Sequence, residues 1–412
     1  MKSFVKFVVD NGGVVKMVKH SDVHDLRNGI TNPSILKHGG KTLVTFRSPS
    51  YSFLVYREKR PDGRNISYYP QNRDNCPMSY SSYNYICELD TDTLEVSNPK
   101  TILTDFNDTR DVQYKGLEDI RMYNDGDNLC CTTSIFSNWG KVDMRINKLD
   151  SDYKVIEEKT YNIIGVEKNW MPVIGRPGVF VHTVPGVVVD TNKNDNIIIR
   201  DKDRNMLYSG STQLVPYGDG YLCICHKRFT NDYVKYIGWG YFHKFIYWNK
   251  DLEIVSESDW FSFMGFPIEF TCGLLVDGDD VIVPFSIFDT CAFIMKFDVS
   301  IIGHLLDKSV EIKKRDFISS PLNDIIRMNN DSDMSMTMGS YITRTSNNPA
   351  SRICCYSYMA SVLDLHAALD LYVRCLCELK KLDMRHNNWF LHAILGEDEI
   401  TSQIDKLLEA TK

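Results

Sequence analysis

The chain has 412 residues, with 47 Lys and Arg against 54 Asp and Glu, so its formal net charge is −7. A mildly acidic protein of this kind is a poor candidate for holding nucleic acid by bulk electrostatics, although a local basic pocket for a phosphorylated ligand is compatible with it. The length suits one large domain with an appendage, or two ordinary domains.

The N-terminus lacks the apolar segment of a secretion signal, and no run of the sequence reaches the length of a membrane span. We therefore expect a soluble, cytoplasmic protein. The 12 cysteines agree with a reducing compartment, because several stand inside apolar runs, as small hydrophobic residues do. None of them has the paired CxxC spacing of a zinc site, so we expect no metal and no cofactor.

Short β-rich runs follow one another from about residue 30 to 298, separated by the Gly, Asn and Asp residues of hairpin turns. The clearest strands are predicted over residues 41–46, 128–133, 186–190, 220–225 and 280–285. The clearest turns are predicted at residues 38–40, 124–127, 218–220 and 277–280. Many hairpins with few helical stretches indicate an all-β fold. A closed ring is favoured, because an open sheet of so many strands would leave its edges exposed.

Two regions depart from this pattern. Residues 57–82 are rich in Arg and Tyr and predict a loop over one end of the ring. Residues 313–359 contain polar stretches typical of linkers or surface loops. Beyond them, helices are predicted over residues 361–379, where apolar residues recur at helical spacing, and over residues 400–408.

The most informative cluster is Glu118, Asp119 and Arg121, which stand beside a strand-like run. If the segment is extended, alternation places Asp119 and Arg121 on the same face. Taken alone, such a cluster is more often an exposed ion pair at a turn. Here, similar joins of a polar or glycine-containing element to a short apolar strand recur at residues 167–172, 210–213, 220–226, 268–274 and 285–289.

This ordered series resembles the five-bladed β-propeller family of mannoside phosphorylases and hydrolases, together with the related β-mannosyltransferases. The resemblance extends over about residues 28–298 and rests on short motifs. It implies an all-β fold, with a five-bladed β-propeller catalytic domain over residues 1–312. Residues 313–412 are then a linker and an appended C-terminal helical tail, which has no counterpart in the family pattern.

The resemblance also implies a proton-transfer residue. Asp119 stands where the family's Glu-Asp-Pro-Arg motif has the aspartate that exchanges a proton with the bridging oxygen. Glu118 and Arg121 keep their places, whereas Ile120 replaces the proline. Glu269 is the candidate for the second carboxylate that a hydrolase needs to activate water, or else it orients a neighbouring base.

A sugar site and a phosphate site follow from the same resemblance. The residues expected to bind the sugar are Asn32, Ser34, Arg47, Arg121, Asn169, Trp170 and Asp289. The residues expected to bind phosphate are Lys168, Arg176, His226, Arg228 and His243, with Lys227 beside them. Neighbouring side chains alternate along a strand, so this second set cannot all face one site. The alternatives to these binding roles are that Asn32 only forms a turn and that His226 has only a structural role.

We thus expect an inverting glycosyltransferase that forms a β-mannoside-like linkage from a nucleotide- or 1-phosphate-linked sugar donor and a carbohydrate acceptor. The alternatives are an inverting glycoside phosphorylase or hydrolase acting on β-mannosides, and a non-catalytic propeller that binds glycans or proteins. No nucleic acid partner and no membrane span are expected. The C-terminal helices are candidates for contacts with a second copy or another partner.

Overall fold

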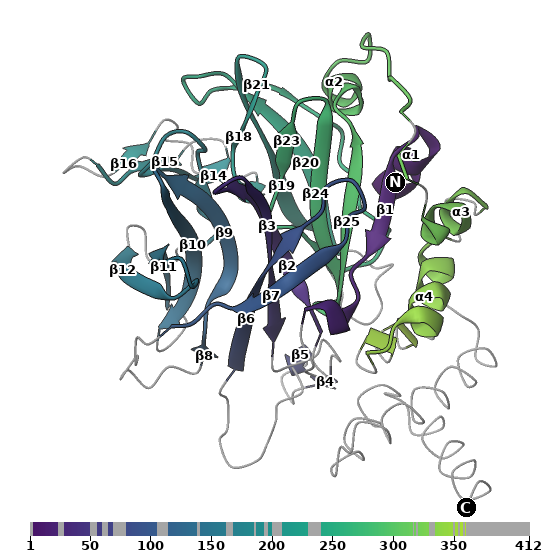
Figure 1. Ribbon diagram of the computed structural model, residues 1–412, viewed down its shortest axis with the longest axis horizontal. Helices are drawn as coiled ribbons and strands as arrows, with labels where there is room; N and C mark the ends of the chain where they lie inside the picture. The colour runs from purple at the N-terminus through teal and green to yellow at the C-terminus, as the bar shows by residue number, and fades with distance from the viewer. Residues whose placement is uncertain are drawn as a thin grey trace, which may run out of the picture.

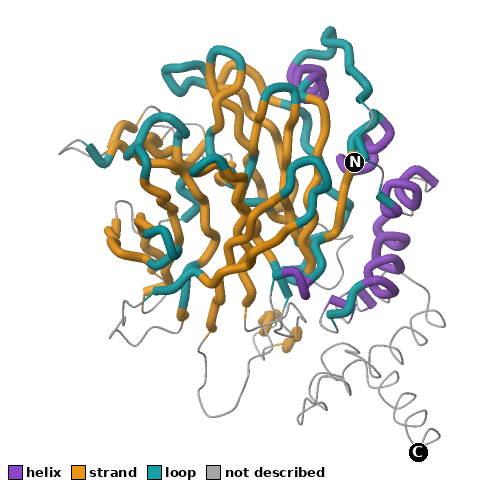
Figure 2. Tube along the Cα trace, viewed as in Figure 1, coloured by secondary structure: helices purple, strands orange, loops and turns teal. Residues whose placement is uncertain are grey.

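A computed structural model describes residues 3–23, 29–49, 56–59, 65–68, 80–104, 114–137, 141–161, 168–184, 187–192, 197–199, 208–229, 240–315, 317–318, 320–328, 334–348, 351–352, 355–356 and 359. These residues form a ring of antiparallel blades, with helices gathered along one side (Figure 1). Figure 2 shows the same division, with strands making up the body of the ring. The predicted five-bladed β-propeller is confirmed.

The blades are antiparallel and are built mainly from consecutive strands, and the third and fourth blades are hydrogen-bonded to each other as one nine-stranded sheet. The first blade contains β2 (Thr31–His38), β3 (Lys41–Pro49), β6 (Tyr80–Leu89) and β7 (Val96–Thr101). The second contains β9 (Glu118–Asp125), β10 (Asn128–Ser137), β11 (Lys141–Leu149) and β12 (Val155–Tyr161). The third contains β13 (Met171–Pro172), β14 (Val179–Val184), β15 (Val187–Asp190) and β16 (Ile197–Ile199).

The remaining two blades complete the ring. The fourth contains β17 (Tyr208–Gly210), β18 (Val215–Tyr217), β19 (Gly220–Phe229), β20 (Gly240–Trp248) and β21 (Ile254–Glu257). The fifth contains β22 (Glu269–Phe270), β23 (Leu275–Asp277), β24 (Asp280–Ile287), β25 (Cys291–Asp298) and β1 (Val14–Met17). Because β1 comes from the N-terminus and pairs with β25, the two ends of the β-rich region close the ring together.

Two smaller pieces of sheet lie outside this plan. The strand β8 (Tyr114–Lys115) pairs in parallel with β6. The strands β4 (Tyr56–Lys59) and β5 (Asn65–Tyr68) form a hairpin within the predicted insertion over residues 57–82. That insertion is described only at this hairpin and at the start of β6.

The hydrophobic core is divided among the interfaces between neighbouring blades. Leu222 and Ile224 of β19 pack toward the fifth blade, whereas Cys223 and Cys225 between them pack toward the third. The same alternation gives separate clusters between the first and second, second and third, and fifth and first blades. Strands buried on both faces explain the near-continuous apolar runs of the sequence. All the described cysteines are free and buried.

The predicted turns and strands agree with the structure. The turns close the hairpins β2–β3, β9–β10, β18–β19 and β23–β24. In the first of them, Gly39 and Gly40 have φ values of 57° and 76°, which glycine adopts without the penalty that other residues incur. The five predicted strands correspond to β3, β10, β15, β19 and β24, and of the predicted residues only 186 lies outside the described part of the chain.

Helices add to the core between the fourth and fifth blades. The described helices are α1 (Phe4–Asp10), α2 (Ser300–Leu306), α3 (Pro321–Met328) and α4 (Met334–Thr345). The expectation of linkers or loops over residues 313–359 was wrong for α3 and α4. The many Ser, Thr and Asn residues of these segments make their apolar faces hard to recognise in the sequence. In the structure, the apolar faces are buried against α1 and the fifth blade through Leu322, Ile326, Met338 and Ile342.

The helix α3 also covers the outer edge of β1. The Asn323 side chain accepts a hydrogen bond from the Val15 amide at 3.1 Å and donates one to the Gly13 carbonyl at 3.1 Å. Ser320 donates to the Val15 carbonyl at 2.7 Å. The backbone amide and carbonyl groups on the open edge of β1 thereby find hydrogen-bond partners in side chains. The helices predicted over residues 361–379 and 400–408 lie outside the described residues, and no helix within the described part is long and apolar enough to cross a membrane.

Candidate active site

Four of the predicted site residues share an uncommon backbone conformation. Asn32, Asp119, Asn169 and Asp289 have φ values of 46°, 56°, 62° and 50°. The strand pairing is irregular beside two of them, between Thr31 and Ser34 in β2 and opposite Asp119 in β10. Bulges and left-handed residues redirect side chains, and they concentrate where a site needs a particular geometry. Asn and Asp tolerate this conformation better than most residues do.

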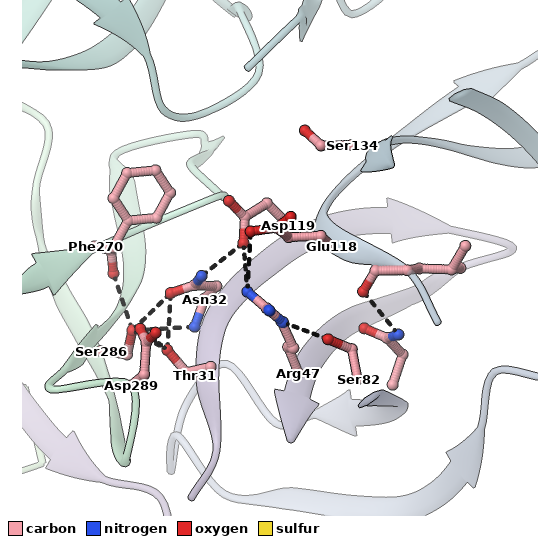
Figure 3. A network of polar contacts seen from close by, with 12 residues as sticks. Thr31, Asn32, Arg47, Ser82, Glu118, Asp119, Ser134, Phe270, Ser286 and Asp289 are labelled. Atoms are coloured by element: carbon pink, nitrogen blue, oxygen red, sulfur yellow. Dashed lines mark hydrogen bonds and ion pairs between the residues drawn. The ribbon is translucent and has the colours of Figure 1, made fainter. Parts of the chain in front are cut away.

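Asp119 lies at the centre of a buried polar cluster (Figure 3). Its Oδ1 atom accepts a hydrogen bond from Asn32 Nδ2 at 2.6 Å and one from Arg47 Nη1 at 3.2 Å. Burial alone raises the pKa of Asp119, but the charges of Arg47, Lys168 and Arg121 and the hydrogen bond from Asn32 outweigh it. The pKa therefore lies below its ordinary value, and the carboxyl group is ionised at neutral pH.

Glu118 faces the same cations from the neighbouring position. Its Oε1 atom lies 3.6 Å from Arg47 Nη1 and 3.7 Å from Lys168 Nζ. Burial raises the pKa of Glu118, against the opposing charges of Lys168 and Arg47. Its Oε2 atom is buried without a hydrogen-bond partner among the described residues. The two adjacent carboxyl groups thus have pKa values shifted in opposite directions.

Arg121 joins three blades rather than contacting the carboxylate of Asp119. Its fully buried guanidinium donates to the Ser211 carbonyl at 2.6 Å, the Asp119 carbonyl at 2.9 Å and Asn169 Oδ1 at 2.9 Å. The charge still acts on Asp119. Arg121 therefore holds the backbone of the second and fourth blades and the Asn169 side chain before the third blade together around the site.

Asp289 is linked to Asp119 through side chains of β2. Thr31 Oγ1 lies 2.9 Å from Asp289 Oδ1 and 2.8 Å from Asn32 Oδ1. Ser286 of β24 lies 3.0 Å from the Thr31 hydroxyl and accepts from the Asn32 amide at 3.0 Å. Burial raises the pKa of Asp289 to about 6, although Arg47 and Thr31 favour its ionised form. The first, second and fifth blades thus contribute to one polar network.

His226 reaches the cluster from the fourth blade as a neutral side chain. Its Nδ1 atom lies 2.8 Å from the Ser211 hydroxyl, and its ring packs edge-on against Tyr241 and Phe270. Burial holds the pKa of His226 well below its ordinary value, and His243 and Arg121 lower it further. His226 is suited to donate a hydrogen bond, but it contributes no positive charge.

Several predicted residues have surroundings that suit structural roles. Ser34 accepts hydrogen bonds from the Met122 amide and from Gln213, and Trp170 packs with Tyr161 and Phe180 in the core. Arg176 donates to the Lys250 carbonyl. No described contact connects these three residues with the carboxylate of Asp119.

Glu269 and His243 are fully buried at the junction of the fourth and fifth blades. The carboxylate of Glu269 accepts backbone N–H groups of Phe263, Met264 and Phe266 at 2.6–2.9 Å, which fixes the preceding loop. Burial raises the pKa of Glu269 to about 7, against these hydrogen bonds. Burial lowers the pKa of His243 to about 3, and its ring packs on Phe261 and Phe263. His243 is therefore uncharged at neutral pH, and the Glu269 carboxylate is held by the loop that precedes it.

The strand β19 separates the remaining basic residues by alternation. His226 is buried, Lys227 is half-buried with its ammonium over the Phe229 ring, and Arg228 is exposed. His226 and Arg228 lie on one face of the strand and Lys227 on the other. The expectation that not all of these residues can share one site agrees with this arrangement.

Four residues of the network were missed in the sequence. Thr31 and Ser286 connect Asp289 with Asn32, Ser82 accepts a hydrogen bond from Arg47 Nε at 2.8 Å, and Ser211 holds His226. Thr31 directly precedes Asn32, and Ser211 and Ser286 lie in the motifs noted at residues 210–213 and 285–289, so these three had a signal. Ser82 is a strand residue whose neighbours come from other parts of the chain.

No protein-family model matches the sequence, and no curated protein matches it at a significant level. Among solved structures, a β-1,2-mannobiose phosphorylase from Listeria innocua is 12% identical, with a TM-score of 0.46, covering 72% of this chain and 94% of its own. A mannose phosphorylase from Leishmania mexicana is 11% identical, with a TM-score of 0.42, covering 74% and 95%. A GDP-Man-dependent mannosyltransferase from Leishmania mexicana is 10% identical, with a TM-score of 0.42, covering 74% and 93%. In fold, the chain is similar to the group of five-bladed propellers to which its motifs pointed.

Proposed function

We propose that this protein is an inverting carbohydrate-active enzyme whose main reaction is transfer of a mannose-like unit from an activated donor to a carbohydrate acceptor. The observation that carries the proposal is the buried Asp119 carboxylate, held by Asn32 and Arg47 beside Glu118 and Lys168. Burying several charges in one cluster is costly unless they are well paired. A propeller that only bound glycans or proteins would have no need for such a cluster.

In the proposed transfer, Asp119 is the general base. An acceptor hydroxyl attacks the anomeric carbon as the bond from that carbon to the donor's phosphate oxygen breaks, and the hydroxyl proton passes to Asp119. The electron pair of the broken bond leaves with the phosphate. A base must be ionised before the reaction, and the lowered pKa of Asp119 meets this requirement.

The leaving phosphate needs positive charge and hydrogen-bond donors. Lys168 is the more accessible of the clustered cations, with a side chain that is 37% exposed, whereas Arg47 is 5% exposed. Neutral His226 adds an N–H donor when its Nδ1 atom is the acceptor for Ser211. Asp289 and Asn32 are the proposed ligands of the sugar hydroxyls, since carboxylate and amide groups each engage two hydroxyls.

Phosphorolysis is the second candidate, because it uses the same groups in the reverse direction. Lys168 and His226 would then hold inorganic phosphate, and Asp119 would protonate the bridging oxygen. Hydrolysis has less support. The carboxylate expected to activate water, Glu269, is bonded to three backbone amides and fully buried.

A donor screen tests the proposal. The purified protein is incubated with GDP-mannose, with mannose 1-phosphate or with β-mannosides and phosphate, in each case with mannose and manno-oligosaccharides as acceptors, and products are detected by mass spectrometry. These substrates are chosen because transferases and phosphorylases both occur among the similar propellers. Product from either activated donor is expected. Turnover of β-mannosides with water alone would favour hydrolysis, and no turnover with any combination would overturn the proposal.

The variant Asp119→Asn tests whether Asp119 acts as the general base. The amide keeps the shape of the side chain but cannot accept the proton, so activity should fall by about a hundredfold or more. Asp125→Asn is the matched control, because Asp125 is an exposed carboxylate at the other end of the same strand, β9. Activity of Asp119→Asn within about tenfold of the parent would exclude the assigned role.

A further inference from the structure

The loop that carries Asp289 is strained and short. Phe288, Asp289 and Thr290 connect β24 to β25, and both Phe288 and Asp289 have a φ of 50°. Consecutive left-handed residues other than glycine persist only where surrounding contacts hold them. The Phe288 amide donates to the Ile268 carbonyl at 2.9 Å, which secures one side of the loop.

The carbonyl of Thr290 secures the other side through three donors. It accepts from the Ile30 amide at 3.2 Å, His20 Nε2 at 2.9 Å and the Ser351 hydroxyl at 3.1 Å. A carbonyl oxygen offers two lone pairs, so three donors on one oxygen exceed the usual number. The donors come from the segment after β1, the segment before β2 and the segment after α4, which are far apart in sequence.

Close packing at the same point supports this convergence. A Cβ atom on Gly29 would lie 2.4 Å from the Thr290 Cα atom and 2.7 Å from the Asp289 carbonyl oxygen. Ser351 is fully buried, and its backbone amide donates a hydrogen bond to Asn348 Oδ1 at 3.3 Å. The loop is therefore packed closely against Gly29, and movement away from Gly29 or from Ser351 would break the hydrogen bonds to the Thr290 carbonyl.

From this convergence we infer that the segment after α4 is a functional part of the active site, with Ser351 as a positioning residue that acts through Asp289. His20 is a second positioning residue on the same carbonyl. The inference rests on the proposed function in one respect, that Asp289 binds the sugar. It gives the segment that follows α4 a role within its own chain.

The test compares Ser351→Ala with Thr343→Ala. Thr343 is the matched control, because its buried hydroxyl also donates to a carbonyl, that of Ser340, away from the Asp289 loop. Loss of one buried hydrogen bond corresponds to about three- to tenfold, so Ser351→Ala should raise KM for the sugar by about that factor with kcat within about twofold. Thr343→Ala should leave both constants near the parent values.

A double variant shows whether Ser351 acts through Asp289. In an Asp289→Asn background, Ser351→Ala should have no further effect on KM, because the side chain that it positions has been changed. A full additional effect on KM in that background would overturn the inference, as would equal kinetics of Ser351→Ala and Thr343→Ala.

Hydrogen exchange provides a readout that does not depend on turnover. Amides of residues 288–291 should exchange about three- to tenfold faster in Ser351→Ala than in the parent or in Thr343→Ala. If the donor screen finds no reaction, the proposed function fails and this measurement alone decides the positioning of the loop. Unchanged exchange at residues 288–291 in Ser351→Ala would overturn the inference even in an active enzyme.

Discussion

At the scale of single residues, four of the residues predicted to form the site have a strained backbone. Asn32, Asp119, Asn169 and Asp289 all have left-handed backbone conformations, and three of them lie in one network of hydrogen bonds. Such conformations cost on the order of 1–3 kcal/mol each and persist when neighbouring contacts compensate for them. In this protein, the compensating contacts are hydrogen bonds between side chains of different blades.

The raised pKa of Asp289 leads to a prediction about stability. A carboxyl group with a folded-state pKa of about 6, above its ordinary 3.8, favours the folded state below about pH 3.8. That contribution is lost as the pH rises through about 6. Asp289→Asn should therefore raise the free energy of unfolding at pH 7.5 by on the order of 2 kcal/mol, with little effect at pH 4. Denaturant unfolding at the two pH values measures this, and an equal effect at both would contradict it.

A second prediction concerns phosphate. Lys168→Ala should weaken binding of mannose 1-phosphate by about tenfold, because a charge-assisted hydrogen bond contributes about 1.5 kcal/mol or more and this lysine is partly exposed. Lys159→Ala, which removes an exposed lysine paired with Glu157, is the control. Isothermal titration with mannose 1-phosphate and with plain mannose measures the effect. Equal losses for both ligands would show that Lys168 does not recognise the phosphate.

The same titrations test the charge of His226. Its pKa lies well below the ordinary value, so its protonation does not change between pH 6 and 8. His226→Ala should weaken phosphate binding by the same factor at both pH values. A loss confined to pH 6 would indicate a charged histidine.

At the scale of elements, closure of the ring depends on a strand and on the helix that covers it. The strand β1 is the outer strand of the fifth blade, and its outer edge is bonded by Asn323 and Ser320 of the α3 region. An unprotected edge strand pairs readily with other chains. The helix thus protects the point at which the ring closes.

Asn323→Ala tests this arrangement. The change leaves the Val15 amide and the Gly13 carbonyl without their partner, which should lower the free energy of unfolding by about 2–4 kcal/mol, roughly 1–3 for each buried group partly offset by water. Arg327→Ala, an exposed position of the same helix, is the control for helix propensity. Chemical denaturation compares the two, and similar losses would exclude a specific role for Asn323.

At the scale of the whole molecule, one side chain connects most of the ring. Gln213 lies in the fourth blade, and its Nε2 atom donates to the Ile35 carbonyl at 2.9 Å and the Met122 carbonyl at 2.8 Å, while Oε1 accepts from the Leu274 amide at 3.2 Å. Segments of four blades therefore meet at one fully buried amide, with Ile35 in β2, Met122 in β9, and Gln213 and Leu274 just before β18 and β23. Gln213 belongs to the motif noted at residues 210–213 of the sequence, and these hydrogen bonds give that motif a structural role in the ring.

The division of the chain near residue 312 remains a prediction. A protein ending there should keep its β-sheet content, but it should associate with itself, because the surface covered by Leu322, Ile326 and Met338 would be exposed. It should also bind sugar more weakly than the full chain, since Ser351 is lost. Circular dichroism and light scattering, with the full chain as control, measure this. An unfolded product would show that the ring requires the C-terminal segment.

The sequence alone determined the fold class, the turns and the best candidate for the proton-transfer residue. Short apolar runs and the Gly, Asn and Asp residues of the turns are local signals within a few residues, whereas the role of Asp119 is implied by the resemblance of its motif to that of a known family. It did not reveal α3 and α4 as packed helices, because their apolar faces are interrupted by polar residues.

Only the tertiary structure decided which polar side chains meet. Arg47 and Asp119 are 72 residues apart, Thr31 and Asp289 are 258 apart, and His20 and Thr290 are 270 apart. It also showed that Glu269 and His243 are fully buried, at the junction of the fourth and fifth blades. The physical reason is that a closed ring brings distant strands to one centre, and the pairing of charges there depends on the packing of all the blades, which no local pattern records.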